Sequence, residues 1–227
     1  MLLSSNNAKM LQKISQKYEW KELYEVSINQ DDYEHLNWHP NFDPNQNWDK
    51  EKDRFLFTID LADGVGRDYT VMNIFKVEPM STAKIRKTSG NAEETDFFRI
   101  VQCGKFHSNS KSIEECSNIL QTLIFEVFGE ELVSVIIESN FKAEYFTEMT
   151  SKHPDFYPEI FIHTKHSKSS KANAIGVRIN RDNKQLYCRE MKSLLDKTRL
   201  VVTCEDTLNE LLSFGLDDKG KFRGQGS

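Results

Sequence analysis

The stretch FTIDLADGVGRDYT, residues 57–70, places three aspartates and two glycines between two apolar segments. The first segment, RFLFTIDLA at 54–62, has the length of a strand, and its continuous apolar character is typical of a strand buried on both faces. The second, YTVMNIFKV at 69–77, follows a short glycine-containing turn, which predicts an antiparallel hairpin. Asp60 is therefore expected inside a buried strand. Burying a carboxylate there costs free energy unless another group or a cation compensates its charge.

The rest of the chain predicts an α/β domain with a mixed central sheet and flanking helices. Ser112 and Glu115 have the spacing of a capping box at the start of an amphipathic helix, and Gly129 marks the end of that helix. Further elements follow from the apolar patterns. We expect strands over 97–106, 132–140, 159–164 and 199–203, helices over 110–129, 140–151, 185–197 and 205–214, and a turn-rich tail over 215–227.

Residues 1–50 differ in character from the sequence that follows. A weakly amphipathic stretch, in which a short helix is expected, leads into an aperiodic segment rich in Asn, Asp, Pro and Trp. We interpret residues 1–50 as a linker or arm, and residues 51–227 as the domain. Trp38, Phe42 and Trp48 are expected to anchor this arm on the domain surface.

Composition restricts the class of protein. The four cysteines contain no C-x-x-C pair, so neither a zinc finger nor a disulfide framework is indicated, and we expect reduced, mostly buried thiols. No apolar window approaches the roughly 20 residues that a membrane-spanning helix needs. The N-terminus lacks the apolar region of a signal peptide, so a cytosolic protein is expected.

The charge is unevenly distributed. The net charge of the chain is −5, but residues 165–199 contain ten basic and three acidic residues, a net of +7, so the remainder carries −12. A basic stretch beside acidic clusters suits a polyanion that is brought to metal ions. A solvated helix face would have the same composition, and this interpretation stays open.

Asp60 and Glu138 are the residues that suggest chemistry. Asp60 alone could cap the turn that follows it. Glu138, however, ends a second apolar strand, SVIIE, and the two carboxylates face each other if the two strands are neighbours. A buried pair of carboxylates repels unless it is protonated or bridged by cations, and Mg²⁺ or Mn²⁺ prefers such oxygen ligands. Two such ions can activate water and stabilise the leaving oxygen of a phosphodiester.

These residues carry a resemblance to a known family. The strand with Asp60, the hairpin D-G-x-G-x-D-Y, the later IIESN and the following basic loop resemble the C-terminal nuclease domain of the large terminase subunit of tailed bacteriophages, a ribonuclease H-like fold. KSSKANAIGVR, LLDKTRLVV and TLNELLSF are similar to later segments of that family in the same order. The resemblance covers roughly residues 54–222, and SSNNAKMLQKI resembles the linker that follows the ATPase half of the family.

The resemblance implies a metal-dependent endonuclease that cuts concatemeric double-stranded DNA during head filling. It implies two Mg²⁺ or Mn²⁺ ions, with Asp60 as the first metal ligand, Glu138 as the second, and Asp63 and Asp68 as weaker acidic positions nearby. The implied partners are DNA, the ATPase half of terminase, the small terminase subunit and the portal protein, with no membrane. The implied location is the cytoplasm of the infected bacterial host, and the protein would not be a stable virion component.

The family's third acidic ligand lies in an H-D-D motif, and this sequence stops at GQGS, where the motif would begin. The nearby Asp217 and Asp218 are interpreted as part of a turn, so we expect weak metal binding and little cleavage from this chain. The chain contains no G-x-x-x-x-G-K-[ST] motif, so the ATP-driven motor half is expected to be absent.

DNA contacts are expected in the loop after the fifth strand, from Lys165, Lys168, Lys171 and Arg178, which could neutralise phosphates without reading bases. The same residues could equally form a solvated loop. His163 and His166 are expected to shape this loop rather than to bind Mg²⁺.

Other functions fit parts of the pattern. A different ribonuclease H-like enzyme, of resolvase or transposase type, would share the acidic strand ends. An actin-like nucleotide-binding domain also uses a strand, an aspartate and a glycine-rich hairpin, but its second phosphate loop is not found. A non-catalytic DNA-binding domain or scaffold is favoured if Asp60 and Glu138 lie apart. A Rossmann domain is excluded because G-x-G-x-x-G is incomplete.

Overall fold

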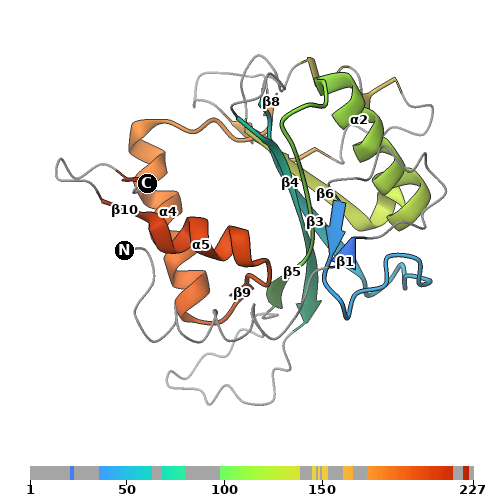
Figure 1. Ribbon diagram of the computed structural model, residues 1–227, viewed down its shortest axis with the longest axis horizontal. Helices are drawn as coiled ribbons and strands as arrows, with labels where there is room; N and C mark the ends of the chain where they lie inside the picture. Colours follow the sequence, from blue (N-terminus) through green and yellow to red (C-terminus); the bar gives the residue numbers. More distant parts are fainter. Residues whose placement is uncertain are drawn as a thin grey trace.

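The computed structural model describes residues 21–22, 36–62, 68–79, 98–138, 145–146, 148, 150–152, 161–165, 173–216 and 222–224. In this part of the chain, a seven-stranded mixed sheet forms the centre (Figure 1). Its strands are β1 (Lys21–Glu22), β2 (Leu36–Trp38), β3 (Arg54–Asp60), β4 (Thr70–Pro79), β5 (Phe98–Ser108), β6 (Val133–Ile137) and β9 (Leu200–Val201).

The strand order is β1-β2-β5-β4-β3-β6, and β9 pairs with β5. Strand β3 is parallel to β6, and β5 is parallel to β9, whereas the other pairs in the sheet are antiparallel. The predicted hairpin of β3 and β4 is confirmed, and β5 continues it as an antiparallel meander. Two small antiparallel pairs lie outside this sheet, β7 (His163–Lys165) with β8 (Asn173–Ile175) and β10 (Phe214–Leu216) with β11 (Phe222–Gly224).

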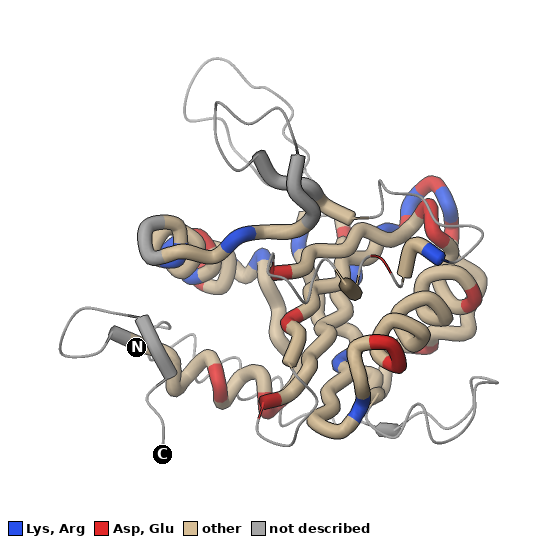
Figure 2. The backbone as a smooth tube through the Cα atoms, turned by 90° about the horizontal axis from the view of Figure 1, so that it is seen from above, with Lys and Arg blue, Asp and Glu red and all other residues tan. Residues whose placement is uncertain are grey.

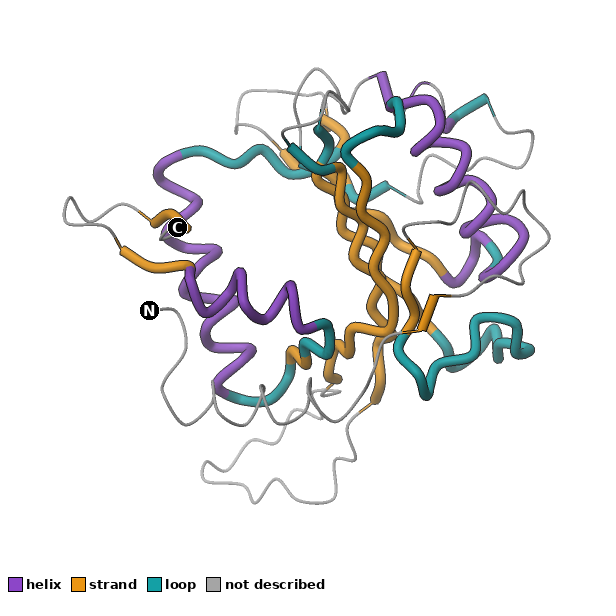
Figure 3. The backbone as a smooth tube through the Cα atoms, in the orientation of Figure 1, coloured by secondary structure: helices purple, strands orange, loops and turns teal. Residues whose placement is uncertain are grey.

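Helices cover both faces of the sheet, as Figure 3 shows. On one face lie α2 (Ile113–Thr122), a π-helical segment (Leu123–Phe128) and a short 3-10 helix (Glu130–Leu132). On the other face lie α4 (Arg181–Asp196) and α5 (Glu205–Ser213). The predicted α/β class, with a mixed sheet and flanking helices, is thus confirmed.

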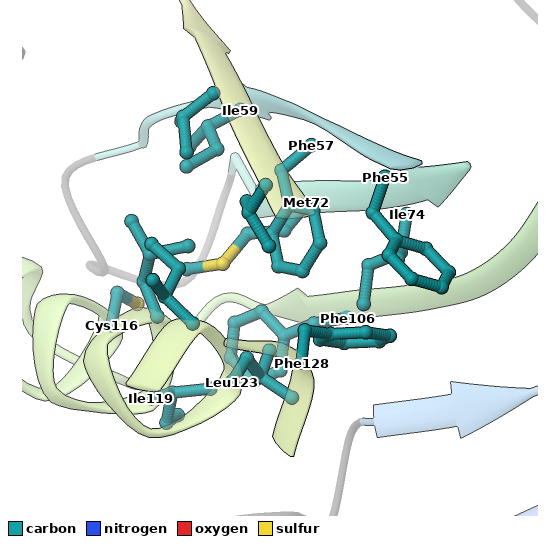
Figure 4. Close-up of a cluster of buried hydrophobic side chains, with 14 of the residues drawn as sticks. Phe55, Phe57, Ile59, Met72, Ile74, Phe106, Cys116, Ile119, Leu123 and Phe128 are labelled. Carbon is teal, nitrogen blue, oxygen red and sulfur yellow. The ribbon is translucent and has the colours of Figure 1, made fainter. Parts of the chain in front are cut away.

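The larger hydrophobic core fills the space between the sheet and α2 (Figure 4). Strand residues Phe57 and Met72 are fully buried there against Leu123 and its neighbours on the helical segment. The strands contribute every second residue because side chains alternate between the two faces of a sheet. A smaller second cluster, which includes Cys188, Leu195, Val202 and Leu208, joins α4, β9 and α5 on the opposite side.

The segment from Leu36 to Trp48 contributes to the larger core. Strand β2 pairs with β5, and Trp38 is only 1% exposed, which goes beyond the expected anchoring on the domain surface. Phe42 stacks between Trp38 and Trp48 with ring centroids 5.3 Å from each. These aromatic side chains therefore act as core residues of the sheet.

The cysteines are free and buried, as predicted. Burial raises the pKa of the Cys116 thiol to about 11 and also raises the pKa of Cys188. A thiol with a raised pKa holds little of the reactive thiolate at neutral pH. The buried thiols therefore behave as small core side chains.

Most predicted elements that the structure describes are present, with shifted ends. The helix expected over 140–151 and the strand expected over 159–164 lie largely outside the described residues. The stretch in which a short N-terminal helix was expected also lies outside them, apart from Lys21 and Glu22, which form strand β1 and not a helix. Within 161–165, Phe161 forms a parallel bridge with Val135 of β6. The tail, expected to consist of turns, contains the β10–β11 pair. Within the described part of the chain, no helix is long and apolar enough to cross a membrane.

The capping box of α2 is confirmed and can be tested. The Ser112 hydroxyl accepts a hydrogen bond from the Glu115 backbone N–H at 3.2 Å, and a Glu115 carboxylate oxygen accepts one from the Ser112 N–H at 2.7 Å. We expect Ser112→Ala to lower the free energy of unfolding by about 1 kcal/mol, because one N–H at the helix start loses its acceptor. Urea denaturation measures this change, and Glu115→Gln, which can keep the reciprocal bond, should cost less.

Candidate active site

Asp60 and Glu138 end two neighbouring parallel strands. In the register of β3 and β6, Ile59 lies opposite Ile137, so the next step along both strands brings Asp60 beside Glu138. The Glu138 N–H donates to the Ile59 carbonyl oxygen at 3.3 Å and carries the pairing one residue past β6. The two carboxylates that the sequence singled out are therefore neighbours across the sheet.

Strand alternation decides which face the two carboxylates occupy. Ile59 and Ile137 point into the larger core and are almost fully buried. Asp60 and Glu138, one residue later, therefore lie on the opposite face, which α4 and α5 cover in Figure 1. The apolar side of the same strands holds the carboxylates in place.

A cleft of about 560 Å³ lies on this face of the sheet. Tyr187 of α4 and Glu210 of α5 form its helical wall. Its remaining lining comes from the strands and from the segment after β8, namely Thr58, Ile59, Asp60, Val71, Asn73, Ile136, Glu138, Val177 and Ile179. The cleft thus combines apolar residues, the polar side chains of Thr58 and Asn73 within the strands, and the carboxylates of Asp60 and Glu138 at the strand ends.

The segment after β8 supports Glu138 from the other side. Val177 pairs with Glu138 in a parallel bridge, and its N–H donates to the Ile137 carbonyl oxygen at 2.7 Å. Gly176, directly before it, is buried and has a positive φ of 80°. Backbone on both sides therefore fixes the end of β6, although β6 itself has no further full strand beyond it among the described residues.

The surroundings favour the protonated form of Glu138. Burial raises the pKa of its carboxyl group, the negative charge of Asp60 raises it further, and the positive charge of Lys184 on α4 opposes these effects. A divalent cation between the two carboxylates would remove their repulsion.

The donor set fits a hard cation only in part. Mg²⁺ is commonly held by one or two carboxylates together with waters and substrate phosphates, and Asp60 with Glu138 provides such a pair. Among the residues that the structure describes, no group of three or more His, Cys, Asp or Glu side chains could hold a metal ion. The third carboxylate of the cleft, Glu210, is thus not gathered with the other two.

The other predicted acidic positions do not join the pair in the described structure. Asp68 is exposed and does not line the cleft. Asp63, Asp217 and Asp218 lie outside the described residues. The structure shows that Asp60 and Glu138 are neighbours, and the metal roles of Asp60, Glu138, Asp63 and Asp68 all stay predictions.

The predicted basic loop is in part a β-hairpin. Lys165 is the last residue of β7 and pairs with Asn173 of β8, so it belongs to a strand and not to a loop as expected. Lys168 and Lys171 lie outside the described residues, as does His166. Arg178 is exposed and lies between Val177 and Ile179, which line the cleft, but it is not itself a lining residue. In the view of Figure 2, acidic and basic positions are interspersed along the described chain.

Sequence reasoning missed three lining residues, Asn73, Tyr187 and Glu210. Asn73 is a polar residue within an apolar strand, and it pairs with Thr58, on the same face of the sheet as Asp60. A polar residue in such a strand indicates a candidate site residue. Tyr187 and Glu210 belong to amphipathic helices, and no pattern in the sequence tells which helical residues meet a distant strand end.

Comparison with known proteins does not place the chain in a family. No protein-family model matches the sequence, and no curated protein matches it.

Glu138 predicts a pH dependence of stability. A carboxyl group with a raised pKa in the folded state stabilises the fold at pH values below its unfolded value of 4.5, and this contribution is lost as the pH rises through the folded pKa. We therefore expect Glu138→Gln, measured without divalent cations, to raise the melting temperature at neutral pH. Below pH 4.5 the same substitution should change the melting temperature little.

The exposed Glu190→Gln in the interior of α4, away from the helix start, serves as the control and should be nearly neutral at both pH values. Mg²⁺ should raise the melting temperature of the unaltered protein and have a smaller effect on Glu138→Gln, because a ligand that binds the folded state stabilises it. Equal destabilisation of Glu138→Gln at all pH values would contradict this account.

Proposed function

We propose that the chain is the metal-dependent endonuclease domain of a phage DNA-packaging terminase, with a ribonuclease H-like fold, and that it hydrolyses phosphodiesters of double-stranded DNA. The observation that carries the proposal is the juxtaposition of Asp60 and Glu138 at the ends of parallel strands, on the wall of one cleft. A non-catalytic domain would be favoured if the two carboxylates lay apart. In the register of β3 and β6, Asp60 and Glu138 lie side by side.

The order of the elements supports the proposal. An antiparallel meander of β3, β4 and β5 is followed by α2, by β6 parallel to β3, and later by α4, β9 and α5. This order is the one that the resemblance implies from the Asp60 strand to the TLNELLSF helix. The mixed sheet is compatible with a ribonuclease H-like fold.

Asp60, Glu138 and Arg178 each have a distinct role in the proposed reaction. Asp60 and Glu138 would hold Mg²⁺ or Mn²⁺, which supplies an activated water and stabilises the leaving oxygen. Arg178, an exposed residue between two residues that line the cleft, would neutralise a phosphate of the incoming DNA backbone without reading its base. Without a bound cation, the carboxylates of the cleft would repel the phosphates of DNA, so DNA binding should depend on divalent cations.

Two measurements test the proposal. Supercoiled plasmid is incubated with the protein and Mg²⁺ or Mn²⁺, and nicking is followed together with the binding of Mn²⁺ to the protein. We expect weak Mn²⁺ binding and slow, cation-dependent nicking, because the third acidic ligand of the family is not matched, and both should be lost in Asp60→Asn and Glu138→Gln. Absence of cation binding, or nicking that persists in both variants, would reject the assignment.

A further inference from the structure

Gln102 of β5 is a fully buried side chain with a fixed orientation. Its Oε1 accepts hydrogen bonds from the backbone N–H groups of Thr203 at 3.3 Å and Cys204 at 3.2 Å, directly before α5. A backbone N–H can only donate, so the oxygen of this amide must face the start of α5. The Gln102 nitrogen, Nε2, is therefore turned to the other side.

The orientation of Gln102 sets the orientation of Asn73. Gln102 Nε2 donates to Asn73 Oδ1 at 2.9 Å, so the oxygen of Asn73 faces β5. The amide nitrogen of Asn73, Nδ2, is on the branch that Gln102 does not hold, and Asn73 lines the same cleft as Thr58 and Asp60. Within the described part of the chain, this nitrogen has no hydrogen-bond partner in the protein.

The chemistry of an amide nitrogen determines which ligand it can meet. An amide NH₂ group has two donor hydrogens and no available lone pair, so it cannot bind a cation and instead donates to an acceptor. The cleft already holds the carboxylates of Asp60, Glu138 and Glu210. A lysine at position 73 would form ion pairs with these carboxylates. The neutral amide of Asn73 leaves the carboxylates available to a cation and can still donate a hydrogen bond to an anionic oxygen.

We propose that Asn73 donates a hydrogen bond to a non-bridging phosphate oxygen of the DNA backbone, and that Gln102 is the positioning residue that keeps this donor turned into the cleft. This inference rests on the proposed nuclease function and identifies a substrate contact in the same site. Gln102 connects the contact to α5, because the same amide holds Thr203 and Cys204 at the start of that helix.

The first test removes the donor. Binding of a fluorescently labelled DNA duplex is measured by anisotropy, with Ca²⁺ in place of Mg²⁺ so that the duplex stays intact. We expect Asn73→Ala to weaken binding about five- to tenfold, the usual effect of one lost hydrogen bond. Asn118→Ala, an exposed asparagine on α2 at the other face of the sheet, should bind as the unaltered protein does.

The second test reverses the donor. In Gln102→Glu, one carboxylate oxygen can still accept from Thr203 and Cys204, but the other oxygen can no longer donate. Asn73 should then turn its NH₂ toward residue 102 and its carbonyl oxygen toward the cleft. We expect a loss of DNA binding at least as large as that of Asn73→Ala.

The double variant separates this positioning role from a general disturbance of α5. If Gln102 acts through Asn73, adding Gln102→Glu to Asn73→Ala causes no further loss of DNA binding, even where the melting temperature falls. A further loss in the double variant would reject the positioning role. If Gln102→Glu does not fold, Asn73→Ala alone still decides whether Asn73 contacts DNA.

The outcomes distinguish the inference from the proposed function. If Asp60→Asn and Glu138→Gln leave the cation dependence of DNA binding unchanged, the nuclease proposal fails. If those variants abolish it while Asn73→Ala binds DNA as tightly as the unaltered protein, the nuclease proposal stands and the inference about Asn73 fails.

Discussion

Asp60→Asn should lower the slow Mn²⁺-dependent plasmid nicking of this chain by about a thousandfold or more, to the rate seen without protein. Metal-ion assistance in phosphodiester hydrolysis is worth several kcal/mol, and each 1.36 kcal/mol corresponds to about tenfold in rate. Asparagine has nearly the shape of aspartate but lacks its charge, so the fold should be kept while the cation is held more weakly. The rate of conversion of supercoiled to open-circular plasmid measures this effect.

A matched variant shows whether the effect is local. Asp206→Asn makes the same chemical change at an exposed position in the first turn of α5, outside the residues that line the cleft. We expect it to nick plasmid at the unaltered rate. An equal loss in both variants would mean that the change in net charge, and not the site at the strand ends, controls activity.

Gly176→Ala should lower the free energy of unfolding by about 3–5 kcal/mol, which combines the strain of a positive φ with overpacking of a closed contact. Gly176 has a φ of 80°, and a Cβ at this position would lie 2.8 Å from Ile137 Cγ2 and still closer to the Ile137 carbonyl oxygen. The backbone oxygen cannot move away without breaking the hydrogen bond from Val177. Urea denaturation and a fall in melting temperature of roughly 10 °C would report the change.

Gly129→Ala provides the comparison for this glycine. Gly129 also has a positive φ, of 90°, but a Cβ there would meet nothing closer than a Glu131 carboxylate oxygen at 3.6 Å. Only the conformational strain should remain, about 1–2 kcal/mol. If the two alanine variants lose equal stability, the clash of a Cβ at position 176 with Ile137 does not contribute to the loss.

The Gly176 contact also bears on the candidate site. Ile137 precedes Glu138, so displacement of the backbone at Ile137 would move the carboxylate that pairs with Asp60. We therefore expect any folded Gly176→Ala protein to bind Mn²⁺ more weakly, whereas Gly129→Ala should bind it normally.

Much of the local structure was predictable because it depends on neighbouring residues. The run from 54 to 62 and its glycine-containing turn predicted the hairpin of β3 and β4, and Ser112 with Glu115 predicted the start of α2. Glu138 could be identified as a candidate site residue because it ends an apolar strand. These features are encoded at short range, through hydrogen-bond spacing and apolar alternation.

Other features depend on which distant segments meet. The sequence placed Lys165 in a loop, but pairing with Asn173 makes it part of a strand. Trp38 was expected on the domain surface, but β2 adds to the edge of β5 and buries it. Such pairings are decided by the whole sheet, because the partner strand supplies the hydrogen bonds and the apolar surface.

By itself, the sequence determined the elements of an α/β domain and the two carboxylates that end its apolar strands. Only the tertiary structure decided that Asp60 and Glu138 are neighbours, through the parallel register of β3 and β6. It also decided that Gln102, held by the start of α5, bonds the oxygen of the Asn73 amide at the lining of the cleft. The reason is physical, since a side chain's identity is local but its direction depends on the hydrogen bonds and packing of segments far away in the chain.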